Sequence, residues 1–88
     1  MASYKSRDSY EKLYDILVVA EQEKRFVTRS AIAQSTGYKP GSVGAYIRNK
    51  LKNVYLFEVQ PNQYEVRGIK SVTFESFAYH MSQMFSDN

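Results

Sequence analysis

The 88-residue sequence predicts one small α+β domain over residues 8–88, in the order helix, short strand, helix, helix, β-hairpin, helix. Three observations support this prediction. Apolar side chains recur at helical spacing near both ends of the chain, and strand-like alternation begins only after Asn53. A glycine and a proline separate two short helical segments in the middle. The apolar content of 43% is that of a globular domain with one core.

The first helix is predicted to begin at Asp8, after a disordered polar tail at residues 1–7. Asp8 can cap the first turn, with Glu11 as its capping-box partner. The core-facing stripe of this helix consists of Tyr10, Leu13, Tyr14, Leu17 and Ala20. The β-prone pair Phe26 and Val27 follows, so a short edge strand is expected after the helix.

Two short helices are predicted next, on either side of a turn. Thr28 is a suitable N-cap for the first of them, and Gly37 suits the left-handed residue that ends it. Pro40 fits the first turn of the third helix, where its missing N–H costs nothing. The buried side of the third helix is predicted to consist of Val43, Ile47 and Leu51. Its outward side is predicted to consist of Gly41, Ser42, Gly44, Ala45, Arg48, Asn49 and Lys52.

A β-hairpin is predicted after the third helix, because aromatic and β-branched residues alternate there with period two. Its strands run over residues 54–59 and 64–69, joined by the turn formers of residues 60–63. Thr73 can cap a final amphipathic helix at residues 73–85. The apolar stripe of that helix consists of Phe74, Phe77, Ala78, Met81 and Phe85.

Basic side chains are concentrated in the middle of the chain. Residues 24–57 contain seven Lys and Arg residues and no Asp or Glu, whereas the flanking segments contain five basic and nine acidic residues. The overall charge of +3 is therefore a +7 middle set against −4 elsewhere. Such a cationic segment in a small domain is typical of a surface that binds a polyanion.

The segment from Phe26 to Gly37, followed by Ser42-Val43 and Tyr46-Ile47, is similar to the helix-turn-helix core of many bacterial regulators. With the hairpin, residues 8–70 resemble a winged helix-turn-helix domain. The resemblance implies that the third helix lies in the DNA major groove and the second braces it across the backbone, while the hairpin wing touches an adjacent groove or phosphates. It implies double-stranded DNA binding, by a small transcriptional regulator or by the DNA-recognition domain of a larger DNA-processing protein.

The DNA-binding residues predicted from this resemblance and from side-chain chemistry are Arg29, Lys39, Gly41, Ser42, Ala45, Arg48, Asn49, Lys50 and Lys52. Arg48 can pair with guanine and Asn49 with adenine, whereas the lysines and Arg29 suit phosphates. The wing candidates are Asn62, Gln63 and Arg67. Residues 61–63 at the wing tip carry no basic side chain, so weak phosphate affinity is expected there.

Two other functions fit parts of the sequence. Winged-helix domains also serve as protein–protein interaction modules, and the uncharged wing tip and small-residue third helix favour that interpretation. The eight tyrosines and five phenylalanines are compatible with a binder of single-stranded nucleic acid, which stacks bases on aromatic rings. Core-compatible spacing argues against this for Tyr10, Tyr14, Phe57, Phe74 and Phe77. We also expect Tyr46 to pack against the first helix or the sheet.

The apolar stripe of the last helix has two interpretations. It is either the final wall of the core or a homodimer interface formed by Phe74, Phe77, Met81 and Phe85. A winged helix that binds palindromic sites needs a two-fold partner, and a terminal helix can supply one.

No enzymatic activity, cofactor or metal is predicted. The chain has no cysteine and one histidine, His80, and no pattern of a catalytic triad or a phosphate-binding loop accompanies them. No apolar run reaches the roughly 18 residues of a membrane span, and residues 1–9 lack the apolar region of a signal peptide. We therefore expect a cytoplasmic protein associated with the nucleoid.

Overall fold

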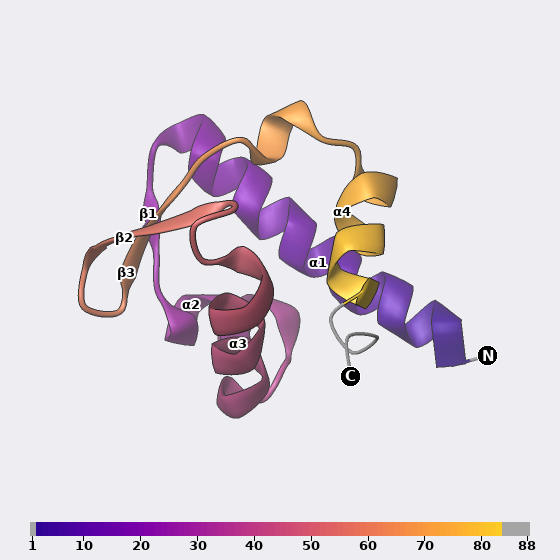
Figure 1. Ribbon diagram of the computed structural model, residues 1–88. Coiled ribbons are helices and arrows are strands. Elements are labelled where there is room, and N and C mark those ends of the chain that lie inside the picture. Colours follow the sequence, from indigo (N-terminus) through magenta and orange to yellow (C-terminus); the bar gives the residue numbers. More distant parts are fainter. Residues whose placement is uncertain (1, 84–88) are drawn as a thin grey trace.

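The computed structural model describes residues 2–83, with side chains from residue 10 onward. Within these residues the chain forms four α-helices and one three-stranded antiparallel sheet, as Figure 1 shows. These elements are α1 (Ala2–Glu23), β1 (Phe26–Val27), α2 (Arg29–Thr36), α3 (Pro40–Tyr46), β2 (Leu56–Gln60), β3 (Gln63–Val66) and α4 (Phe74–Ser82). The predicted α+β class and order of elements are confirmed. Two short elements were not predicted: α3 continues into a π-helical segment at Ile47–Leu51, and a 3-10 turn at Ile69–Ser71 precedes α4.

The first helix is longer than predicted. α1 begins at Ala2 rather than at Asp8, so the predicted helix start and cap at Asp8 are wrong. Residues 2–7, predicted as a disordered tail, form its first turns. These residues include no Gly or Pro that would stop the helix from extending toward the N-terminus. In Figure 1 the N-terminal turns of α1 extend past α4.

The sheet has the strand order β1-β3-β2, with antiparallel pairing on both sides of β3. The predicted hairpin is confirmed, and Asn62 adopts a left-handed φ of 63° in its turn. β2 begins at Leu56, later than predicted. β3 ends at Val66, earlier than predicted, because Gly68 at a φ of 80° turns the chain away from the sheet.

One core lies between α1, the sheet, α3 and α4. Its buried apolar members come from every one of these elements and are Tyr10, Leu13, Leu17, Ala20, Val27, Ile32, Val43, Ile47, Leu51, Leu56, Val66, Ile69, Phe77 and Met81. Four of the five residues predicted for the core stripe of α1 are among them, and Tyr14 is half-buried against the same cluster. The core therefore holds α3 and the hairpin against the same long helix.

α4 forms the final wall of this core. Thr73 caps it as predicted, with its hydroxyl oxygen accepting a hydrogen bond from the Ser76 backbone N–H at 3.1 Å. Phe77 and Met81 are fully buried within one copy, which agrees with the core-wall interpretation of this stripe, and a homodimer interface stays a prediction. Phe74 is half-buried with its ring 5.7 Å from that of Tyr14. α4 ends at Ser82, with Gln83 as its C-cap. The fourth predicted interface residue, Phe85, and the last two positions of the predicted helix at 73–85 lie outside residues 2–83.

Within residues 2–83 we find no helix with the length and hydrophobicity needed to cross a membrane.

Candidate nucleic-acid interface

The candidate interface is built on α2, α3 and the turn between them. Thr28 caps α2, because its hydroxyl oxygen accepts a hydrogen bond from the Ala31 backbone N–H at 3.1 Å. Gly37 ends α2 at a left-handed φ of 80°, and its N–H donates to the Ala33 carbonyl at 2.9 Å. Both ends of α2 are as predicted. Arg29 is thereby held in the first turn, with its side chain exposed.

α3 presents one side to the core and the other to solvent. It begins at Pro40, as predicted. Val43, Ile47 and Leu51 form its buried side, as predicted, and each exposes 3% of its surface or less. These three residues are spaced four positions apart. In an ideal α-helix of 3.6 residues per turn, each would be rotated further around the axis than the one before it. The helix keeps them on one side by changing its pitch after Tyr46.

This change of pitch is the π-helical segment Ile47–Leu51. The backbone N–H of Lys52 donates to the carbonyl of Ile47, five residues earlier, at 2.7 Å. Each residue of the wider turn advances less around the axis, so Leu51 stays in line with the buried side. Arg48 and Asn49 lie on the exposed side of this segment, as predicted.

Arg29 of α2 and Arg48 of the π-helical segment meet over Gly44. A Cβ atom placed on Gly44 would lie 3.3 Å from the Arg29 Nη1 atom and 3.5 Å from the Arg48 Nη1 atom. The two nitrogens are therefore no farther apart than about twice that distance. Arg48 reaches Gly44 because helical side chains lean toward the N-terminus, over the residue four positions earlier. We call Arg29 and Arg48 the arginine pair.

Among residues 10–83, the arginine pair lacks the carboxylate partners that Arg25 and Arg67 have. Arg25 forms an ion pair with Glu23 at 2.7 Å, and Arg67 forms one with Glu65 at 3.0 Å. No Asp or Glu between residues 10 and 83 lies within ion-pair distance of either member of the arginine pair. The positive charge of the pair is thus left uncompensated within the part of the chain that the structure describes.

The other predicted residues of α3 differ in exposure. Lys39, Gly41, Ser42 and Asn49 are exposed, and Ala45 is half-buried. The first turn of α3 therefore presents small side chains and one lysine to solvent, which allows another molecule to approach its backbone closely.

Lys50 lies at the edge of this face and is half-buried. Its backbone carbonyl accepts a hydrogen bond from Nε2 of His80 at 2.8 Å. The carbonyl can only accept, so the proton must be on Nε2 of the imidazole. This bond joins α4 to the end of the π-helical segment, which gives His80 a structural role.

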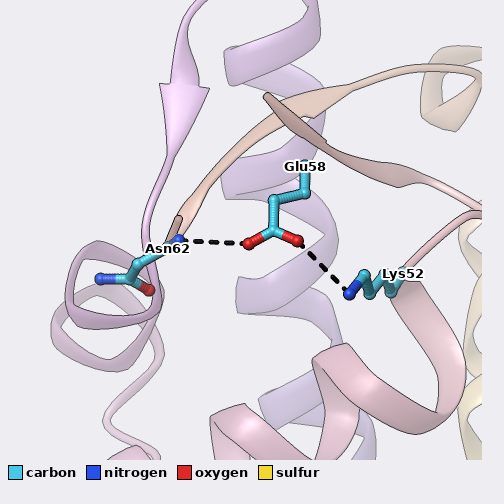
Figure 2. A network of polar contacts seen from close by, with 3 residues as sticks. All are labelled: Lys52, Glu58 and Asn62. Atoms are coloured by element: carbon cyan, nitrogen blue, oxygen red, sulfur yellow. Dashed lines mark hydrogen bonds and ion pairs between the residues drawn. The ribbon is translucent and has the colours of Figure 1, made fainter. Parts of the chain in front are cut away.

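Lys52 forms an ion pair within the protein. Its Nζ atom lies 3.3 Å from one carboxylate oxygen of Glu58, on β2. The other oxygen of Glu58 accepts a hydrogen bond from the backbone N–H of Asn62 at 3.4 Å, as Figure 2 shows. The Asn62 side-chain oxygen accepts a further bond from the Arg29 backbone N–H at 3.4 Å. These contacts tie the tip of the hairpin to the start of α2 and to the end of the π-helical segment.

The remaining hairpin candidates face different surroundings. Gln63 is half-buried in the first position of β3. Arg67 lies beyond the other end of β3, away from the turn, with its guanidinium carbon 4.7 Å from the centroid of the Phe57 ring. Together with its ion pair to Glu65, this contact holds Arg67 against the sheet. The structure brings neither side chain into contact with the arginine pair.

Most aromatic rings pack against each other rather than forming an exposed platform. Tyr46 packs against α1, as predicted, with its ring 6.4 Å from Tyr10 and 5.3 Å from Tyr38. Burial raises the pKa of the Tyr10 hydroxyl, and the neighbouring Tyr46 raises it further. Burial likewise raises the pKa of Tyr55, whose ring lies 5.8 Å from that of Phe77. These rings are committed to packing between α1, α3 and α4.

Sequence reasoning missed two residues of the interface. Gly44 was predicted to face outward, yet it is buried beneath the side chains of the arginine pair. Glu58 was assigned no role from the sequence, yet it joins Lys52 to Asn62. The spacing of Gly44 four residues before Arg48 was a usable signal, because helical side chains cover that position.

The described residues offer no site for a metal. No group of three or more His, Asp or Glu side chains lies close enough together within them to hold an ion. What they offer is an exposed cationic face on α2 and α3, with the hairpin fastened beside it. Comparisons of the chain with protein-family models, with curated proteins and with solved structures find no match.

Proposed function

We propose that the chain is a winged helix-turn-helix domain that binds double-stranded DNA. It would act as a small transcriptional regulator or as the DNA-recognition domain of a larger DNA-processing protein. One observation carries the proposal: the arginine pair on α2 and the π-helical segment has no carboxylate partner among residues 10–83, whereas Arg25 and Arg67 elsewhere are both paired. Uncompensated cations on an exposed helix face favour a ligand with closely spaced negative charges, which the DNA backbone supplies.

The shape of this face supports the same ligand. From Pro40 to Leu51, α3 and the π-helical segment form one continuous helical rod. A rod of this kind fits the major groove of B-DNA, which is about 12 Å wide. Ser42 and Asn49 on its exposed side carry groups that can bond base edges, and Lys39 at its start suits a phosphate. The small side chains at its first turn would let the backbone come close to the groove.

The hairpin has a supporting role in this proposal. Its tip carries no basic residue, and Lys52 already holds Glu58. Asn62 holds the tip against α2. We therefore assign the hairpin to fixing the angle between α2 and α3, with α3 as the main contact to DNA.

The first test is binding to a random duplex of about 25 base pairs across a salt series, followed by fluorescence anisotropy. Each phosphate contact contributes about 0.9 to the negative slope of log affinity against log salt concentration. Arg29, Lys39, Arg48 and Lys50 would make three or four phosphate contacts, which should give a slope of about −3 to −4. Lys39→Ala should reduce that slope by about one contact.

Arg25→Ala is the matched control, because it removes one positive charge that is paired with Glu23 outside the α2 and α3 face. It should leave the salt slope of the wild type nearly unchanged. Absence of binding even at low salt would overturn the proposal. Equal slopes for Lys39→Ala and Arg25→Ala would overturn the assignment of the face.

A winged-helix protein–protein interaction module is the second candidate. The observation that favours it is a shallow apolar hollow between α1, β1 and α2, lined by Ile16, Val19, Phe26 and Ala31. The side chain of Phe26 is 51% exposed and that of Val19 is 44% exposed. Neither member of the arginine pair lines this hollow. Failure to bind DNA together with a stable complex lost on Phe26→Ser would favour this candidate.

A further inference from the structure

The arginine pair has a geometry that goes beyond general cationic attraction. Two long, positively charged side chains from different elements converge on one point above a buried glycine. Like charges repel, and within residues 10–83 no carboxylate lies close enough to offset this repulsion. An anion bound between the two guanidinium groups would offset it.

The support beneath the two side chains makes this a defined site. Gly44 is buried and provides no side chain, so one guanidinium nitrogen of each arginine lies within 3.5 Å of the position that a Cβ atom would occupy. Arg29 is anchored from its other end, where its backbone N–H donates to Asn62 on the hairpin. Arg48 is anchored in the π-helical segment between buried Ile47 and Leu51. The backbone positions of both arginines are thus held by tertiary contacts.

We propose that the arginine pair forms a single phosphate-binding site, in which both guanidinium groups hold the same DNA backbone phosphate above Gly44. This inference rests on the proposed DNA binding for the source of the phosphate. Planar guanidinium groups can each donate two parallel hydrogen bonds to phosphate oxygens. Arg48 then positions the helix on the backbone, instead of reading guanine as its place on α3 predicted. Asn49 becomes the main candidate for reading a base edge.

A double-mutant cycle on DNA binding tests whether the two arginines share one ligand. Arg29→Gln and Arg48→Gln should each weaken binding to the random duplex about tenfold. The double variant should bind DNA little more weakly than either single variant, because loss of one arginine already breaks the shared contact. The loss should be the same for duplexes of different sequence, as expected for a phosphate contact. Arg25→Gln is the control with the same change in net charge.

Gly44→Ala tests the geometry with both arginines still present. The added methyl group would lie 3.3 Å from the Arg29 Nη1 atom, which would have to move by a few tenths of an ångström, and 3.5 Å from the Arg48 Nη1 atom, which is an ordinary contact. We expect DNA binding that is at most a few-fold weaker, because only one of the two guanidinium groups has to move. Alanine is the better helix former, so weaker binding would not come from loss of the helix.

Titration with dimethyl phosphate tests the site without DNA. The side-chain NMR signals of Arg29 and Arg48 should shift together with one shared dissociation constant, while those of Arg25 should not. In Gly44→Ala the shared shift should shrink. A matched titration with chloride corrects for ionic strength.

The outcomes separate the two proposals. The shared site is supported if the losses for Arg29→Gln and Arg48→Gln are not additive in the double-mutant cycle and if both arginines respond together to dimethyl phosphate. Neither result requires the sequence preference of the protein to be known. DNA binding with additive arginine losses, or with an Arg48 loss that depends on sequence, would overturn the shared site and leave the DNA proposal standing. A coupled response to dimethyl phosphate without DNA binding would overturn the DNA proposal and retain the anion site.

Discussion

Glu21 shows how one side chain can join distant parts of the chain. Its two carboxylate oxygens accept hydrogen bonds from the backbone N–H groups of Gly68 at 3.0 Å and Lys70 at 2.9 Å. Partial burial would raise the pKa of Glu21, but these backbone hydrogen bonds and the charge of Lys70 outweigh it and hold the pKa below its ordinary value of 4.5. The end of α1 is thereby tied to the turn after the hairpin.

Glu21→Gln should destabilise the fold by about 1 kcal/mol at neutral pH, because two backbone donors lose a charged acceptor at a position where solvent screens the interaction. A lowered pKa stabilises the folded state above the pKa of the unfolded chain. That contribution is lost as the pH falls below 4.5 and through the folded pKa, so the difference between wild type and variant should shrink there. Urea denaturation over a pH series measures it.

The control for this prediction is Glu23→Gln. Glu23 pairs with Arg25 on the surface, and pairs of this kind contribute about 0–1 kcal/mol. A loss for Glu21→Gln that stayed constant from neutral to acidic pH would contradict the assigned role of its charge.

At the scale of elements, features set by neighbouring residues were predictable from the sequence. Thr28, Gly37, Pro40 and Thr73 occupy their predicted positions at helix ends. A cap depends on hydrogen bonds that span only three or four residues, so short patterns suffice to find it. The buried side of α3 was predictable for the same reason, since its periodicity is local.

Features that depend on contacts between elements were not predictable in this way. The exposed basic residues of the candidate interface were found, but the convergence of Arg29 and Arg48 depends on how α2 packs against α3. The link from Lys52 through Glu58 to Asn62 depends on the position of the hairpin. Single-sequence patterns carry no direct information on such distances.

The hairpin contact leads to a prediction that rests on the proposed DNA binding. Glu58→Gln removes a negative charge beside the candidate interface and releases Lys52 from its ion pair. DNA affinity should rise, and the salt slope should steepen by up to about one phosphate contact. Stability should change by no more than about 1 kcal/mol. Anisotropy over a salt series and urea denaturation measure the two effects.

Glu65→Gln provides the matched control. It makes the same change in net charge and releases Arg67, which lies against Phe57 on the sheet instead of near α3. An equal gain in affinity for the two variants would show that net charge alone is responsible. The specific role of Lys52 would then be wrong.

At the scale of the whole molecule, the core couples the candidate interface to α4. Phe77 of α4 is fully buried, with its ring 5.5 Å from Tyr14 on α1 and 5.8 Å from Tyr55 before the hairpin. The same core contains the buried side of α3. The helix that carries the cationic face therefore depends on packing at the far end of the chain.

Phe77→Ala should destabilise the protein by about 3–5 kcal/mol, through lost burial and the cavity left behind. This is a large share of the about 5–15 kcal/mol typical of a folded domain. Urea denaturation followed by circular dichroism measures the loss. Tyr79→Ala, at a position that is 67% exposed on the same helix, should be nearly neutral by comparison. Similar losses for both variants would contradict the assignment of α4 as a core wall.

The size of the molecule bears on how it would lie on DNA. Its longest extent is 36 Å, which is about the length of one turn of B-DNA. One copy would therefore cover about one half of a palindromic site. Pairing of two copies stays a prediction, and Phe77 and Met81 are already buried in the core of each copy.

The π-helical segment can absorb a change in chain length just before the hairpin. A π-turn encloses one residue more than an α-turn, so the stretch from Ile47 to Leu51 contains a surplus residue. Deleting one residue here would restore α-helical pitch. Because each residue of the wider turn advances less around the axis, the residues that follow would keep nearly the same angle about the helix. A single-codon deletion in this segment is thus a change that the fold could accept while the hairpin keeps nearly its present orientation.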